Sequence, residues 1–336
     1  MQHPIHATRR HFLGQLAGGA VLACGATPSW AQAGGWQPQR SMRIIVPSTP
    51  GGISDTLARV VAEHLSTSWG KPCVVENKPG GGGITGSQEL LRHPADGHTL
   101  LTCSPGPQAT AYSLFPKLPY KEGDFAAVSG MVKMPNVLVI HPSVPAYTVS
   151  EFVAYARANP NKLNYGGPIG SSLHLSGLWF NQLTRTRATH IPYPGSAQAG
   201  AALLSGEIQF MFDNLASYVQ HVRSGKIRAL GVSTAERSAL LPDVVTVNST
   251  MPELAEFEVA TWVGLVTAAG APPEALAAIN LKVREALAKP AAIDRINAVA
   301  GRADWQPVDK YDAFVKSEVR RWSGIIKRAG LQLEIT

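Results

Sequence analysis

Four glycine-rich loops each precede a helical pattern, and together they could bind an anion through backbone N–H groups. They are PSTPGGISD (47–55), KPGGGGITGS (78–87), YGGPIGSS (165–172) and PYPGSAQ (192–198). A helix N-terminus leaves backbone N–H groups without partners and carries partial positive charge. Glycine lets a ligand approach that backbone closely. One such loop is explained as a turn, but four in one chain favour an anion site built from amides.

Other chemistries find little support in the sequence. GGISD does not match the dinucleotide pattern G-x-G-x-x-G, and no loop ends in Gly-Lys-Ser/Thr, so we expect no phosphate chemistry. The chain has no G-x-S-x-G, H-E-x-x-H or C-x-x-C motif. Its few scattered cysteines cannot form a structural zinc site. We therefore predict no enzyme, no cofactor and no metal.

Three side chains near these loops could act in catalysis or contact a ligand, but each has a structural alternative. His174 follows Ser172 at a helix start and could be a base, although capping or packing is the favoured role. Asp213 ends the apolar strand FMFDN. It could be a general base, cap the helix from Asn214 or orient a water at a ligand, and we favour the last two. Asp55 is expected to be an N-cap first and a ligand contact second.

Alternating strands and helices must position these loops. The apolar runs RIIV, CVVEN and HTLLTCS are each followed by a helical pattern, the first over Asp55–Trp69. Such alternation with continuous apolar strands predicts a buried, mostly parallel sheet. A second α/β series follows NVLVIHPSV (136–144), and two long helices over 273–288 and 309–329 close the chain.

We predict an α/β fold of two lobes with a ligand cleft between them. The first lobe is expected to be discontinuous, over residues 34–138 and 235–336. The second is expected over residues 139–234. Two lobes connected by more than one chain crossing could close on a ligand like a clamshell.

Cys73 and Cys103 lie in separate apolar runs, CVVEN and LLTCS. If RIIV lies between these runs in a parallel sheet, the two cysteines are second neighbours, roughly 9–10 Å apart. A disulfide needs Cα atoms within about 7 Å. We therefore expect two free, buried thiols.

The N-terminus is typical of an export signal. Paired arginines in TRRHFLGQ precede a short apolar stretch and the small-residue site AQA, so we expect a twin-arginine-type signal peptide over residues 1–33. Lipidation at Cys24 is a less favoured alternative. These features predict a protein of the periplasm.

The bulk composition agrees with a globular protein. Residues are 45% hydrophobic and 16% charged, and the net charge is +7. Without residues 1–33, which hold two arginines and no acid, it is +5. No basic cluster is interleaved with aromatics, so we expect no nucleic-acid partner.

Several motifs in order resemble one family: VPSTPGGISD, VVENKPGGGGITG, HPADGHTLL, FPKLPY, HIPYPGS, FMFDN, SGKIRALGVS and LPDVVTV. The mature chain is similar throughout to Bug-type (TctC-like) solute receptors of tripartite tricarboxylate transporters. The resemblance implies a two-lobe periplasmic-binding-protein fold of type II with two crossover strands. It also implies a small carboxylate ligand held mainly by amides and waters, and a two-component membrane permease as partner. We expect a monomer.

The resemblance also implies a set of ligand-binding residues. The loop after the first strand supplies the first group, the second glycine loop a neighbouring wall, and the second lobe the rest. The set comprises Ser48, Thr49, Gly51, Gly52, Asp55, Gly83, Gly170, Ser171, Ser172, His174, Tyr193, Gly195, Ser196 and Asp213.

Three departures from the family pattern bear on specificity. Ser48-Thr49 stands where an aromatic or proline pair is common, which makes the pocket mouth smaller-walled and more polar. The loop 165–172 is one residue short, and Ala111-Tyr112 replaces Asn-Pro. We therefore expect the carboxylate mode to survive while the specificity changes.

Two alternative functions stay open at the level of sequence. The same ligand binding could serve a sensor that is read out by a membrane kinase. An exported enzyme on the same fold would use Asp213 or His174, but it lacks a nucleophile or metal.

Overall fold

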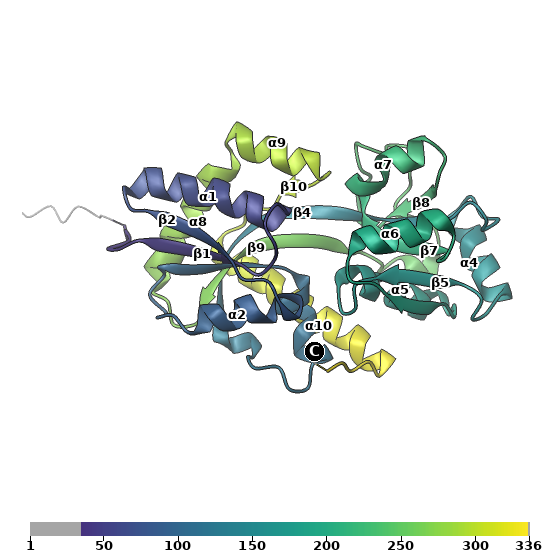
Figure 1. The fold of residues 1–336 in the computed structure, drawn as a ribbon, viewed down its shortest axis with the longest axis horizontal. Coiled ribbons are helices and arrows are strands. Elements are labelled where there is room, and N and C mark those ends of the chain that lie inside the picture. Colours follow the sequence, from purple (N-terminus) through teal and green to yellow (C-terminus); the bar gives the residue numbers. More distant parts are fainter. Residues whose placement is uncertain (1–34, 335–336) are drawn as a thin grey trace, which may run out of the picture. The chain divides into compact units, whose positions relative to one another are not determined.

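Strands and helices alternate through residues 35–334, the part of the chain that the structure, a computed structural model, describes (Figure 1). The expected signal peptide over residues 1–33, with Cys24, lies outside these residues. The strands are β1 (Met42–Val46), β2 (Cys73–Asn77), β3 (Thr99–Cys103), β4 (Phe125–Ile140), β5 (Asn164–Gly167), β6 (Thr189–Pro192), β7 (Phe210–Asn214), β8 (Arg228–Val232), β9 (Ala260–Ala268) and β10 (Arg302–Ala303).

The helices occupy the segments between these strands and the end of the chain. They are α1 (Ile53–Trp69), α2 (Ile84–Leu91), α3 (Ala111–Leu114), α4 (Val149–Ala158), α5 (Ser172–Thr184), α6 (Ser196–Ser205), α7 (Leu215–Arg223), α8 (Pro273–Leu287), α9 (Pro290–Ala298) and α10 (Val308–Ala329). The two long closing helices are confirmed as α8 and α10. The short α9 between them is not among the elements expected from sequence.

The sheet is only partly parallel, so the expectation of a mostly parallel sheet was wrong. β1 pairs in parallel with both β2 and β3, and β5 pairs in parallel with β6 and β7. Every pairing of β4 and β9 with a neighbour is antiparallel. These two strands run from one half of the sheet toward the other, and their direction is set by that connection rather than by the strand–helix alternation.

β4 belongs to both halves of the sheet. Its first part, Phe125–Pro135, pairs with β9, and its last part, Asn136–Ile140, pairs with β7 and β8. A second stretch of chain, which leads through Val259 into β9, crosses between the two halves beside β4. Val259 N–H donates to Ser233 O, and Ser233 N–H donates to Asn136 O of β4, each at 2.9 Å. The two halves are thus joined by two adjacent stretches of chain. The expected lobe boundaries stay a prediction.

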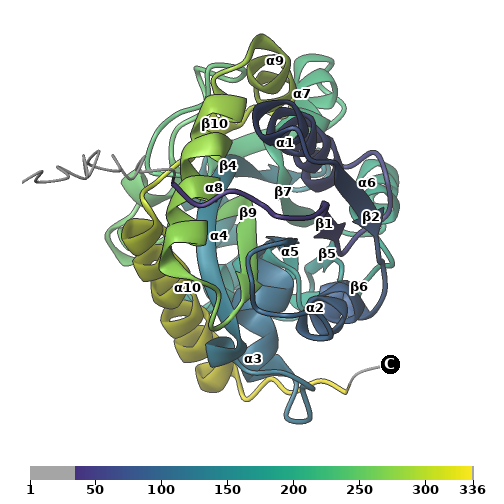
Figure 2. The same cartoon turned by 90° about the vertical axis from the view of Figure 1, so that its left-hand side faces the viewer.

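Helices cover both faces of the strands that carry the first two glycine loops. α1 lies on one side of β1 and β2, and α2 lies on the other (Figures 1 and 2). α1 buries Leu57, Val61 and Leu65, as the spacing of four predicts. The glycines between each strand and its helix are therefore held between packed elements.

The two cysteines are free thiols, as predicted. β1 lies between the strands that carry them, which confirms the arrangement that excluded a disulfide. Cys103 is buried, whereas Cys73 is only partly buried. No helix within residues 35–334 is both long and apolar enough to span a bilayer.

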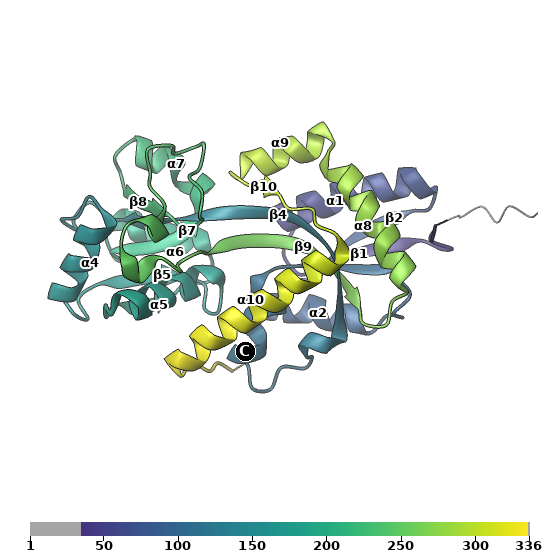
Figure 3. The same cartoon turned by 180° about the vertical axis from the view of Figure 1, so that it is seen from behind.

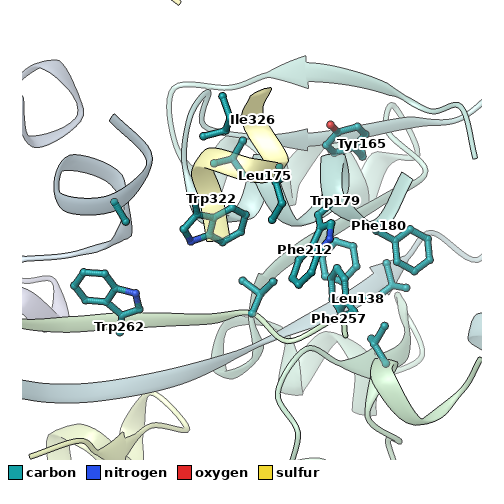
Figure 4. Close-up of a cluster of buried hydrophobic side chains, with 14 of the residues drawn as sticks. Leu138, Tyr165, Leu175, Trp179, Phe180, Phe212, Phe257, Trp262, Trp322 and Ile326 are labelled. Carbon is teal, nitrogen blue, oxygen red and sulfur yellow. The ribbon is translucent and has the colours of Figure 1, made fainter. Parts of the chain in front are cut away.

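The largest apolar cluster includes side chains from α10, α5 and the segment before β9 (Figure 4). Figure 3 shows α10 reaching from the β9 side of the sheet toward α5. Trp322 of α10 and Trp179 of α5 are in edge contact, with ring centroids 6.3 Å apart. Gln182 Nε2 also donates to Ile325 O at 3.1 Å. α10 is therefore a third connection between the two halves of the sheet.

We predict that Trp322→Ala lowers the free energy of unfolding by about 3–5 kcal/mol, because it removes a fully buried indole from this cluster. Urea denaturation followed by circular dichroism measures the change. Leu281→Ala, at a side chain that is 52% exposed, is the control and should change stability little. Equal effects of the two substitutions would contradict the importance of the α10–α5 contact.

Candidate functional site

A cavity of about 740 Å³ lies where three loops that follow strands meet. Gly81 and Gly82 come from the loop after β2, and residues 104–107 come from the loop after β3. Residues 168–172 come from the loop after β5, and Thr261 comes from β9. Ligand sites of open α/β sheets lie at such carboxyl ends of strands. The cavity thus lies between loops of both halves of the sheet.

One hydrogen bond connects the two sides of this cavity directly. Thr110 Oγ1, in the segment after β3, donates to Gly170 O at 3.1 Å. Both residues line the cavity and both are buried. The bond therefore connects the loop that begins α5 to the β3 side of the cavity.

Three of the sequence-predicted site residues, Gly170, Ser171 and Ser172, line the cavity. Gly83 is buried beside Gly82, where an added Cβ would lie 2.9 Å from Pro107. Ligand contact by the residues outside the lining stays a prediction. Those residues are Ser48, Thr49, Gly51, Gly52, Asp55, Gly83, His174, Tyr193, Gly195, Ser196 and Asp213.

The loop before α2 requires glycine at four successive positions. Gly80, Gly81, Gly82 and Gly83 have φ values of 136°, 54°, 64° and 100°. Side chains strain the backbone in this region of φ, whereas glycine does not. The run can therefore form a cavity wall made of backbone.

The expectation that no loop matches the dinucleotide pattern was wrong in one place. Residues 81–86, which follow β2 and run into α2, do have the pattern G-x-G-x-x-G. A dinucleotide site also needs an acidic residue near the end of the following strand to bind the ribose. That strand is β3, which ends at Cys103 and is followed by Ser104, so neither residue is acidic. The run therefore carries no support for a nucleotide.

The start of α5 presents backbone donors at the cavity. Ser171 is the N-cap, and its Oγ accepts the N–H of His174 at 3.3 Å. Helix geometry leaves the N–H groups of Ser172 and Leu173 without intrahelical acceptors. The helix dipole adds positive potential at this end. An anion in the cavity could therefore be bound without a charged side chain.

His174 has a packing role, as favoured from the sequence. It is 4% exposed, and its ring stacks on His190 with centroids 3.7 Å apart. His174 Nδ1 accepts the Gly170 N–H at 3.1 Å, and His190 Nε2 donates to Gly167 O at 3.0 Å. Burial, together with the neighbouring His190, lowers the pKa of His174 to about 3. Two neutral imidazoles therefore hold the loop that begins α5.

Asp55 supports the first glycine loop, but it is not the N-cap that sequence predicted. The N-cap of α1 is Gly52, so Asp55 lies in the first turn. Its Oδ2 accepts the N–H of Gly51 at 3.0 Å, and Arg59 and Asn77 also donate to its carboxylate. Burial acts to raise the pKa of Asp55, but these hydrogen bonds outweigh it and keep the pKa below its usual value.

Asp213 is buried within a hydrogen-bonded cluster on the opposite half of the sheet. Its carboxylate accepts hydrogen bonds from the hydroxyls of Ser196 and Tyr218 and from the N–H of Asn214. Burial raises its pKa above the usual value, against the effect of these donors. The cluster joins β7 to the starts of α6 and α7, which favours the structural role.

Tyr193, another residue of the predicted set, donates a hydrogen bond from its hydroxyl to the carboxylate of Glu207 at 2.8 Å.

Sequence reasoning missed much of the cavity wall. Ser104, Thr110, Phe115, Thr261 and Leu333 line it but were not singled out. Ser104 follows β3 at its carboxyl end, so the rule that picked out the other loops could have found it. Thr261 and Leu333 approach the cavity through the crossing strand and the segment after α10, which no local pattern indicates.

Comparison with known proteins places the chain in a family. The profile of the tripartite tricarboxylate transporter family receptor matches residues 57–331. The chain belongs to this receptor family. Protein BugT of Bordetella pertussis is 33% identical over 302 residues, which cover 88% of this chain and 91% of BugT.

Solved structures agree with this family and with the two-lobe fold. A protein of R. palustris solved with adipate has a TM-score of 0.75 at 30% identity, over 88% of this chain and 99% of its own. The periplasmic binding protein BugD has a TM-score of 0.72 at 28% identity, over 88% and 100%. MatC from Rhodopseudomonas palustris, with bound malate, has a TM-score of 0.70 at 29% identity, over 86% and 99%. The family is a class of solute-binding receptors.

The buried histidine pair predicts that the fold loses stability in mild acid. The folded pKa of His174 is lowered, so between that value and about pH 6.5 the unfolded chain binds more protons. Stability should fall by about 2 kcal/mol for His174 alone between about pH 7 and pH 5, measured by urea denaturation. The double variant His174→Asn/His190→Gln keeps an acceptor and a donor but does not titrate. An equal acid loss in that variant would contradict the assignment.

The Asp55 network makes a second stability prediction. Asp55→Ala should cost about 1–3 kcal/mol at neutral pH, because it removes charge-assisted hydrogen bonds that hold Gly51. The pKa of Asp55 in the folded protein is below its usual value of 3.8. The difference in free energy of unfolding between the variant and the unchanged protein should therefore shrink as the pH falls below 3.8 and through the lowered pKa. Chemical denaturation at several pH values measures it. A difference independent of pH would refute the network's ionic character.

Proposed function

We propose that the protein captures a small carboxylate in the 740 Å³ cavity and delivers it to a two-component membrane permease. The observation that carries the proposal is the start of α5, where Gly170, Ser171 and Ser172 line the cavity. The adipate and malate in solved relatives support a carboxylate as ligand. The periplasmic relative BugD and the export-signal pattern of residues 1–33 support a periplasmic location.

The lining favours an anion bound by amides rather than by cations. Among residues 35–334, no Lys, Arg or His lines the cavity. A hydrogen bond from a neutral donor to a carboxylate is worth about 1.5–3 kcal/mol. Two or three of these, together with closure of the cleft, could supply the roughly 8 kcal/mol of a micromolar complex. Such a receptor can hold its ligand and still release it to a permease.

The surroundings of Asp213 and His174, the two candidate catalytic residues, do not favour a role in catalysis. Asp213 accepts three hydrogen bonds, and His174 is buried against His190 with its Nδ1 engaged. Neither residue lines the cavity. Both side chains are therefore better suited to hold the loops than to transfer a proton to a ligand.

A thermal-shift screen followed by calorimetry tests the proposal. Acetate, hexanoate, benzoate, malate, adipate and citrate would each be compared with an uncharged amide of matched size. A carboxylate at about 100 times its Kd should add about 2.7 kcal/mol of stability, whereas the amide should add little. Failure of all carboxylates to stabilise the protein would overturn the proposed function.

Ser172→Asp tests the place of binding. An acidic side chain suits the first turn of a helix, so the variant should stay folded, but its charge should repel an anion there. We expect affinity for the best carboxylate to fall by about tenfold or more, which corresponds to 1.4 kcal/mol. Ser150→Asp, the same change in the first turn of α4, is the matched control. Unchanged affinity in Ser172→Asp would contradict the site.

A further inference from the structure

We infer that the cavity selects an amphiphilic monocarboxylate, with one anionic end and an apolar body, over dicarboxylates and tricarboxylates. This inference rests on the proposed function, because it names the ligand class of the same cavity. It follows from the difference in chemistry between the residues at the start of α5 and the other residues that line the cavity.

The anionic end fits the start of α5. There Ser171 and Ser172 line the cavity, and Ser172 Oγ lies 3.3 Å from Thr261 Oγ1. Thr261 in turn donates to Asn136 Oδ1 at 3.1 Å. Asn136 is 0% exposed, and its Nδ2 has no partner among residues 35–334, which leaves an unused donor one hydrogen bond behind the wall. Polar groups thus gather at this end.

Most of the other side chains that line the cavity are apolar. They come from the start of α2, the segment after β3, the loop before α5 and the segment after α10. They are Ile84, Pro107, Ala111, Phe115, Ile169 and Leu333. Each methylene that a ligand buries against such a wall should tighten binding by about fourfold. Pockets for drug-sized ligands have volumes of about 300–1,000 Å³. At about 740 Å³, this cavity has room for an acid with a longer carbon chain than acetate.

The only charged residue that lines the cavity, within the described residues, is acidic. Glu334 follows Leu333 in the segment after α10. Glu334 is exposed, and a second carboxylate beside it would meet this like charge with no Lys or Arg of the lining to offset it. Such repulsive elements help a site to discriminate between ligands. Lys117 lines the adjoining pocket, which shares Phe115, Leu333 and Glu334. A diacid confined to the cavity would meet Glu334 alone, whereas one that reached the adjoining pocket would also meet Lys117.

Calorimetry with hexanoate and adipate tests the inference, because the two acids have the same carbon chain and differ in one carboxylate. We expect hexanoate to bind about tenfold or more tightly than adipate, and octanoate and 4-phenylbutanoate to bind more tightly still. Adipate binding as tightly as hexanoate would overturn the inference while leaving the proposed function intact. If no acid bound, the proposed function itself would fail.

Two variants assign the preference to residues. Glu334→Gln should raise adipate affinity about fivefold or more relative to hexanoate affinity, whereas the same change at exposed Glu256 should leave the ratio of the two affinities unaltered. Ile169→Ser, at a side chain that is 53% exposed and so of little weight in folding, should weaken octanoate more than adipate. An unchanged ratio of the two acids in Glu334→Gln would overturn the role of that carboxylate.

Discussion

The structure depends on a single strand that both halves of the sheet share. β4 pairs with β9 up to Pro135 and with β7 and β8 from Asn136 onward. At the point of change, Ser233 Oγ accepts the N–H of Asn136 at 3.1 Å and donates to Val259 O at 2.5 Å, and Ser233 and Asn136 are fully buried. Buried polar groups need such partners, because an unpaired one costs about 1–3 kcal/mol. The hydrogen bonds therefore hold the two crossings together, beside the cavity that Thr261 lines.

This constraint supports the proposal that an anion is bound without a cation. The crossing strands place the loops after β2, β3 and β5 around one cavity, and the start of α5 supplies donors there. His174 and His190 hydrogen-bond to the loop before α5 as neutral rings. They add no positive charge, so the positive electrostatic potential at the cavity comes from the N-terminus of α5. α10 connects the halves a third time through Trp322 and Trp179. The proposed site therefore relies on the positions of backbone groups rather than on a charged side chain.

Most of the strands and helices could be predicted from the sequence, whereas the features that depend on contacts between distant segments could not. Runs such as RIIV and LLTC have successive apolar residues, so the strands and the helices that follow them could be predicted from local sequence. The position of β1 between β2 and β3 was assumed in the disulfide argument, and the pairings confirm it. The antiparallel direction of β4 and β9 depends on which distant strand each meets, which no local pattern encodes. Asp55 looked like an N-cap because its side chain suits that position, but Gly52 begins α1 and Asp55 binds Gly51 and Arg59 instead. The wall formed by Thr261 and Leu333 is a tertiary feature.

The most direct measurement is a crystal structure of the protein with hexanoate bound. The account predicts carboxylate oxygens within about 2.7–3.2 Å of the N atoms of Ser172 and Leu173, with the alkyl chain against Phe115 and Leu333. A carboxylate paired instead with a lysine or arginine, or bound outside the cavity between the β2, β3 and β5 loops, would contradict it.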